Sequence, residues 1–90
     1  MENAFGFKAS HIPDAVYTLP SGERVAFELE IAQKSKARYR DKIQNYVNVI
    51  RAQRGKPESV GSVHYLCFRK QPFEFLKSET RMYGDMFKVD

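Results

Sequence analysis

The spacing of apolar residues along the chain switches between a period of two and a helical period, and each switch marks a predicted element. A period of two predicts strands over residues 3–9, 14–19, 24–31, 62–69 and 86–89. A helical period predicts helices over residues 35–54 and 72–83. The order β-β-β-α-β-α-β predicts an α/β fold, with a mixed β-sheet covered by helices.

The hairpin and the first helix give the clearest local patterns. The segment Pro20-Ser21-Gly22-Glu23 joins two alternating strands and predicts a hairpin connection. The first helix has one apolar stripe, made of Tyr39, Ile43, Tyr46, Val47 and Ile50. The strand over 62–69 carries apolar residues on both faces, which predicts a central strand covered on both sides.

Acidic residues gather at one end of the predicted hairpin. On the strand over 24–31, Glu28 and Glu30 share a face, about 6–7 Å apart. Matching the apolar residues across the hairpin sets Leu19 opposite Val25, with a connecting loop over residues 21–23. This register places Asp14 opposite Glu30. The hairpin therefore predicts that three carboxylates converge.

Three converging carboxylates have two interpretations, and the sequence leaves both open. Carboxylate oxygens suit a hard cation such as Mg²⁺ or Mn²⁺, which activates water and neutralises a phosphate under attack. Alternatively, the acids are solvated on an open face and offset by the lysines and arginines that follow them.

Composition limits the class of protein. A chain of 90 residues is one small domain over 1–90, and its single cysteine, Cys67, excludes a disulfide framework and a cysteine-rich zinc site. The sequence has no membrane-length apolar run and no signal-peptide pattern, so we expect a cytoplasmic protein.

The positive charge is concentrated in the predicted first helix and its flanks. The whole chain carries +4, whereas residues 33–56 hold eight Lys and Arg residues against Asp41 alone, a net of +7. Such a segment either tracks a phosphate backbone or is simply a solvated helix face. The residues expected to contact nucleic acid are Lys34, Lys36, Arg40 and Arg51.

Pro13-Asp14, a hairpin and then Glu28-Leu29-Glu30 resemble the motif of the PD-(D/E)XK, or restriction-endonuclease-like, nuclease superfamily. More narrowly, three runs are similar to the replication-relaxation family associated with plasmid mobilisation. These runs are His11-Ile12-Pro13-Asp14-Ala15, Ala26-Phe27-Glu28-Leu29-Glu30 and Lys42-Ile43-Gln44-Asn45-Tyr46. The resemblance implies a restriction-endonuclease-like core that here lacks its first helix.

The resemblance also implies roles for individual residues. Asp14 and Glu28 would bind the metal, with Glu30 standing where the motif has its lysine. The next helix can supply the missing lysine, and Lys42 is the first candidate, ahead of Lys34 and Lys36. Lys42 and Tyr46 are four residues apart, so both are expected to face the acids.

Two functions follow from the resemblance and the charge pattern. The first is Mg²⁺- or Mn²⁺-dependent hydrolysis of DNA, with Asp14, Glu28, Glu30 and Lys42 as the site. The second is a catalytically inactive DNA-binding or assembly module of a replication-relaxation or mobilisation protein. The missing first helix further implies a homodimer, or a fragment of a longer protein with an upstream domain.

Overall fold

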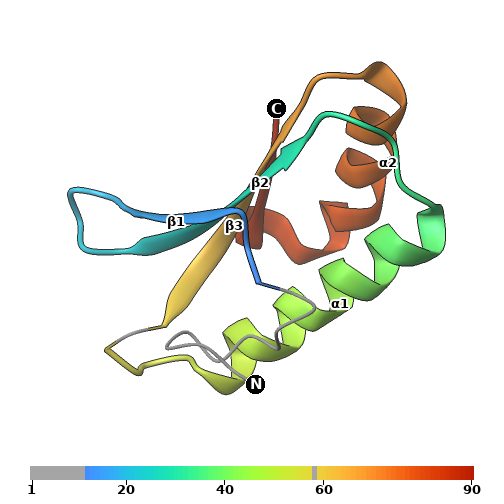
Figure 1. The fold of residues 1–90 in the computed structure, drawn as a ribbon. Helices are drawn as coiled ribbons and strands as arrows, with labels where there is room; N and C mark the ends of the chain where they lie inside the picture. Colours follow the sequence, from blue (N-terminus) through green and yellow to red (C-terminus); the bar gives the residue numbers. More distant parts are fainter. Residues whose placement is uncertain (1–11, 58) are drawn as a thin grey trace.

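The computed structural model describes residues 12–57 and 59–90 (Figure 1). Its elements, in chain order, are β1 (Ala15–Thr18), β2 (Arg24–Glu30), α1 (Lys36–Ala52), β3 (Val60–Cys67), α2 (Lys70–Thr80), a 3-10 segment (Arg81–Met86) and β4 (Phe87–Val89). The predicted order from the second strand onward is confirmed. The predicted strand over 3–9 and His11 lie outside the described residues.

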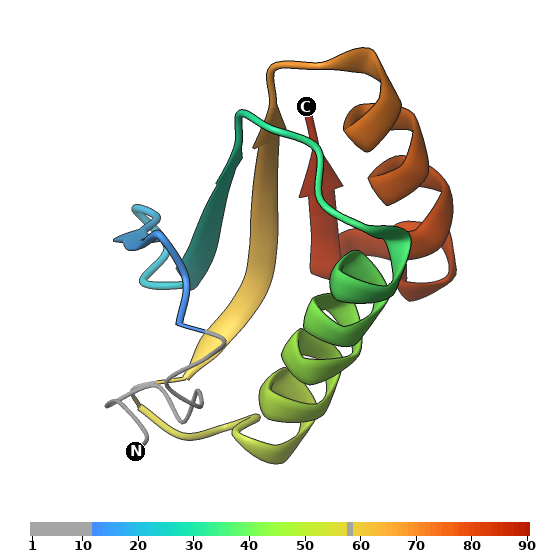
Figure 2. The same cartoon turned by 45° about the vertical axis from the view of Figure 1, so that its right-hand side comes forward.

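The four strands form one mixed sheet in the order β1-β2-β3-β4. β1 is antiparallel to β2, whereas β2, β3 and β4 are parallel neighbours. α1 connects β2 to β3, and α2 with the 3-10 segment connects β3 to β4. Figure 2 shows both helices on the same side of the sheet. The molecule is therefore an α/β fold of two layers.

The core lies between the helices and the covered face of the sheet. α1 buries its predicted stripe, which is Tyr39, Ile43, Tyr46, Val47 and Ile50. The facing sheet residues include Ala26, Val63 and Tyr65. Since α1 is amphipathic, its outer face is polar, and no helix in the described ranges is long and apolar enough to cross a membrane.

The prediction that the strand over 62–69 is covered on both faces is wrong for the described residues. Crossovers of one hand between parallel neighbours added in one direction place both helices on the same face. On the other face, the Tyr17 hydroxyl lies 3.2 Å from His64 Nδ1, and His64 Nε2 lies 2.9 Å from Asp90 Oδ2. Phe68 remains 65% exposed there.

The hairpin register differs from the predicted one by two residues. Ala15 lies opposite Phe27, whereas the predicted register sets it opposite Leu29. Carried one residue further, this register sets Asp14 beside Glu28, so the predicted pairing of Asp14 with Glu30 is wrong. The assignment of side chains to faces is as predicted, because a shift of two preserves it.

The turn explains the shift. Gly22 has φ +92°, and its N–H donates to Leu19 O at 2.9 Å. This geometry is a three-residue loop, over 20–22, whose third position requires a positive φ and therefore favours glycine. Pro20 suits the first position because its ring fixes φ. The loop has the predicted length but begins one residue before the predicted 21–23.

Candidate functional site

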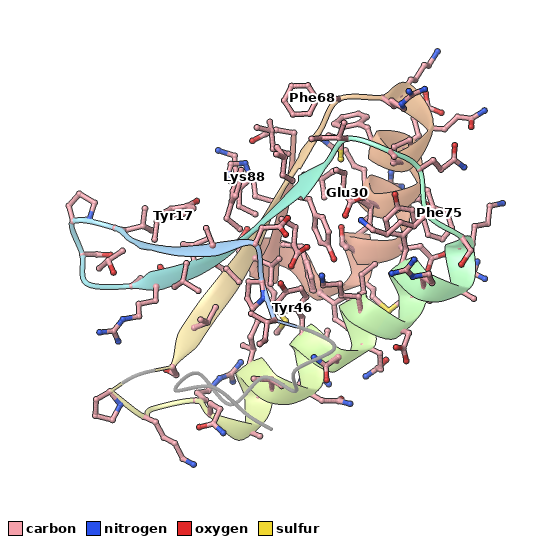
Figure 3. All side chains as sticks on the ribbon, in the orientation of Figure 1. Tyr17, Glu30, Tyr46, Phe68, Phe75 and Lys88 are labelled. Atoms are coloured by element: carbon pink, nitrogen blue, oxygen red, sulfur yellow. The ribbon has the colours of Figure 1, made fainter. Side chains whose placement is uncertain are left out.

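Glu28 and Glu30 lie on the covered face of β2, under the helices. Each is 1% exposed, and Figure 3 shows Glu30 between the sheet and the helices. The interpretation of these acids as solvated groups on an open face is therefore wrong. Two buried carboxylates require nearby cations or hydrogen-bond donors, because burial disfavours their charged form.

Glu28 receives its partners from α1. Lys42 Nζ lies 2.9 Å from Glu28 Oε1, and the Tyr46 hydroxyl donates a hydrogen bond to Oε2. The two donors are four residues apart, and one helical turn therefore brings both to the same carboxylate. The prediction that Lys42 and Tyr46 face the acids is confirmed.

Glu30 receives its lysine from the adjoining loop. Lys34 Nζ lies 3.0 Å from Glu30 Oε1 and 2.9 Å from Oε2, and the Tyr39 hydroxyl donates to Oε2 at 3.1 Å. The backbone N–H of Lys34 in turn donates to the Tyr39 hydroxyl at 3.1 Å. Glu30 is thus held by a closed local network.

Asp14 lies at the bend before β1 and is exposed. Its Oδ2 accepts the backbone N–H of Leu29 at 2.8 Å, which anchors the carboxylate at the edge of β2. Its negative charge is close enough to raise the pKa of Glu28. Asp14 therefore joins Glu28, while Glu30 belongs to a separate cluster with Lys34.

The predicted convergence of three acids is not found. Across residues 12–57 and 59–90, no three His, Cys, Asp or Glu side chains are grouped closely enough to hold one metal ion. The structure brings together a pair, Asp14 and Glu28. Mg²⁺ binds proteins through as few as one or two carboxylates, but both Glu28 oxygens already accept hydrogen bonds from Lys42 and Tyr46, so a cation at this pair would replace one of these contacts.

Opposing effects act on the Glu28 carboxyl. Desolvation by burial is the largest and raises its pKa, and the charge of Asp14 raises it further. The hydrogen bonds from Tyr46 and Lys42, together with the charge of Lys42, lower it, but the net pKa is raised. Burial and the neighbouring Glu28 also raise the pKa of Tyr46, so this hydroxyl remains a hydrogen-bond donor.

Tyr65 was not identified from the sequence as a site residue. It is fully buried on β3, directly opposite Glu28 in the sheet, and its hydroxyl has no hydrogen-bond partner among the described residues. Burial, then the charges of Glu28 and Glu30, raise its pKa. The period-two pattern places Tyr65 on the same face as Cys67, but only the parallel register places it beside the acids.

The predicted nucleic-acid residues divide into two groups. Lys34, Lys36 and Arg40 lie at or just before the first turns of α1, and Lys36 and Arg40 are exposed. Lys36 Nζ lies 5.7 Å and the Arg40 guanidinium 5.3 Å from the centre of the Phe75 ring. Arg51 is in the last turn of α1, about 20 Å along the axis from Lys36.

No family model, no curated protein and no solved structure matches this chain.

Proposed function

We propose that the protein is a Mg²⁺- or Mn²⁺-dependent phosphodiesterase acting on DNA, with a site like that of the PD-(D/E)XK nucleases. One observation carries the proposal. Lys42 from α1 lies 2.9 Å from Glu28, and Asp14 accepts the backbone N–H of Leu29, the residue after Glu28, at 2.8 Å. Two acids and a lysine are the side chains that the resemblance requires.

Asp14 and Glu28 would hold the divalent cation, which supplies an activated water and neutralises charge on the phosphate. Tyr46 holds Glu28 Oε2 and so fixes the carboxylate beside Asp14. Lys42 is less than one-quarter exposed and provides a positive charge at the same point. This charge stabilises the negative charge that develops on the phosphate.

The basic residues at the start of α1 support DNA as the substrate. Lys36 and Arg40 are exposed on the turn of α1 that follows the Glu30 cluster. Lys36 provides positive charge for a phosphate backbone, whereas the Arg40 guanidinium is already paired with Glu79 at 3.1 Å. Phosphate contacts dominate affinity for DNA regardless of its sequence.

A second candidate function, a DNA-binding module without catalysis, is favoured by a different observation. Glu30 stands at the motif lysine position, and both of its oxygens contact Lys34. Glu30 and Lys34 therefore form a structural ion pair in this alternative. In this alternative the fold and the basic turn bind DNA and no bond is broken.

A cleavage assay with matched variants separates the two functions. The wild type, Asp14→Asn, Glu28→Gln and an exposed control, Asp85→Asn, are incubated with supercoiled, linear and single-stranded DNA in Mg²⁺ or Mn²⁺. We expect cleavage by the wild type and the control and none by the other two variants. Cleavage that persists in Asp14→Asn and Glu28→Gln rejects the site. Salt-dependent binding by an inactive wild type supports the binding module.

A further inference from the structure

A pocket of about 450 Å³ lies beside the Glu30 cluster, where α1 and α2 begin. It is located past the carboxyl ends of the parallel strands β2 and β3, where open α/β sheets generally bind ligands. Its volume falls within the roughly 300–1,000 Å³ of small-molecule sites. Its lining includes Gln33, Lys34, Lys36, Gln71, Glu74 and Phe75.

Several polar groups on the pocket wall make no ion pair or hydrogen bond through their side chains within the described part of the chain. Lys36 makes no ion pair there, and its only described interaction is with the Phe75 ring at 5.7 Å. The side-chain amides of Gln33 and Gln71 make no hydrogen bond with any described residue. The wall therefore offers one cation and two amides to a ligand.

The pocket wall is also aromatic. The rings of Tyr39 and Phe75 have centres 5.9 Å apart and an interplanar angle of 37°. Phe75 projects from α2 near the start of α1, as labelled in Figure 3. Aromatic side chains beside cations are the usual platform for the bases of unpaired nucleic acid.

The pocket adjoins the Glu30 cluster, and Glu30 neighbours Glu28 along β2. Lys34 and Tyr39 line the pocket, and the same two side chains bind Glu30. Glu30 is two residues from Glu28 on the same face of β2. The acid site and the pocket are therefore linked along the sheet through Glu30.

The first turn of α2 adds donors to this wall. Gln71, which lines the pocket, belongs to that turn and carries a backbone N–H, whereas Pro72 has none, and the N-cap residue Arg69 makes no side-chain cap. Uncapped N–H groups at the start of an 11-residue helix favour an anion. They add to Lys36 as a site for phosphate.

We propose that this pocket binds one unpaired nucleotide of the DNA strand, and that the substrate is single-stranded or locally unpaired DNA. Lys36 and the start of α2 hold the phosphate, the Phe75 wall holds the base, and Gln71 and Glu74 face its polar edge. A base inside a duplex is paired and stacked, so it enters such a recess only after it is flipped out. This inference rests on the proposed function, because it assumes DNA at the acid site.

Binding measured without a divalent cation tests the pocket separately from cleavage. The fluorescence anisotropy of a short labelled single strand is compared with that of its blunt duplex, for the wild type, Lys36→Met and Phe75→Leu. We expect the wild type to bind the single strand about tenfold more tightly, and each variant to lose most of that preference.

Two controls match the variants in chemistry. Lys56→Met removes a lysine beyond the far end of α1, and Phe68→Leu removes an exposed aromatic ring directly after β3. Both should retain the preference for the single strand. Circular dichroism melts check that Phe75→Leu is folded, and Lys36→Met tests the pocket at an exposed position.

The outcomes separate the pocket from the nuclease. Equal affinity for the two DNAs, or an equal loss in Lys36→Met and Lys56→Met, overturns the pocket. Competition by free dAMP that matches competition by unlabelled single strand assigns the pocket to a free nucleotide and also overturns the proposal. If the wild type prefers the single strand but no protein cleaves DNA, the pocket proposal is supported and the nuclease proposal is rejected. If cleavage depends on Asp14 and Glu28 but the wild type shows no preference for the single strand, the nuclease proposal is supported and the pocket proposal is rejected.

Discussion

Glu28 and Glu30 are two residues apart on one face of β2, both are 1% exposed, and each contacts one lysine and one tyrosine hydroxyl. They differ in where the partners come from. The lysine of Glu30 is four residues along the chain, in the loop, whereas the lysine of Glu28 is 14 residues away on a packed helix. Glu28 also has Asp14 beside it.

This difference separates a structural ion pair from a candidate reactive one. The Glu30–Lys34 pair is local in sequence, so it forms when the loop after β2 takes its folded conformation. The Glu28 pair exists only when α1 is docked on the sheet, and it leaves a carboxyl whose raised pKa reflects burial and a like charge. Carboxylates in this condition are typical of functional sites, although structural networks also produce them.

The largest effect is expected from Lys42→Met. It removes the cation from Glu28, whose side chain is 2% exposed, and leaves a buried charge without its partner. Loss of one member of a buried pair lowers the free energy of unfolding by about 3–5 kcal/mol. Urea denaturation at neutral pH measures the loss, and the double variant Glu28→Gln/Lys42→Met should recover most of it. A double variant as unstable as Lys42→Met would contradict the electrostatic cause.

Tyr46→Phe should have the next largest effect. It removes the hydroxyl that donates to Glu28 Oε2, and hydrogen bonds to charged groups contribute about 1.5–3 kcal/mol. The ring packing is kept, so thermal and urea melts report mainly the lost hydrogen bond. If Tyr46→Phe is as stable as the wild type, Glu28 does not need this donor.

Lys34→Met should have a smaller effect than Lys42→Met. Lys34 is 36% exposed, so water replaces its ammonium at Glu30 more easily, and exposed pairs contribute about 1 kcal/mol or less. Tyr39 still donates to Glu30 in this variant. Urea denaturation of the two lysine variants compares the free energy that each ion pair contributes. A larger loss in Lys34→Met than in Lys42→Met would show that the more buried pair is not the more stabilising one.

The smallest expected effect is the pH dependence that Glu28 gives to the free energy of unfolding. The folded-state pKa of Glu28 is raised above 4.5, so the folded protein binds this proton more tightly than the unfolded chain does. Its contribution to stability is therefore lost as pH rises from the unfolded pKa through the folded one. Glu28→Gln should remove this fall, so its stability relative to the wild type should increase with pH. A pH-independent difference in urea denaturation would show that Glu28 does not titrate in this way.

Local patterns were sufficient to predict part of the fold and of the site. The helical period fixes which side of α1 is buried, and it therefore placed Lys42 and Tyr46 toward the acids. Period-two alternation likewise fixed the face shared by Glu28 and Glu30.

The rest depends on contacts that no local pattern contains. Matching apolar residues does not distinguish between strand registers that differ by two residues. The third position of the loop needs a positive φ, and placing Gly22 there selects one of these registers. Tyr65 reaches Glu28 through the parallel register of β2 and β3. The handedness of the crossovers, rather than the apolar content of β3, places both helices of the described residues on one face of the sheet.

The loop closed by Gly22 limits how this protein tolerates insertions and deletions. If the three-residue loop is kept, adding or removing one residue in β1 would turn its side chains to the opposite face, and the Asp14 carboxylate would leave the edge of β2. A change of two residues would restore the face but slide Asp14 along β2, toward or away from Glu30. With the three-residue loop kept, only the present number of residues between Asp14 and Glu28 sets the two acids beside each other.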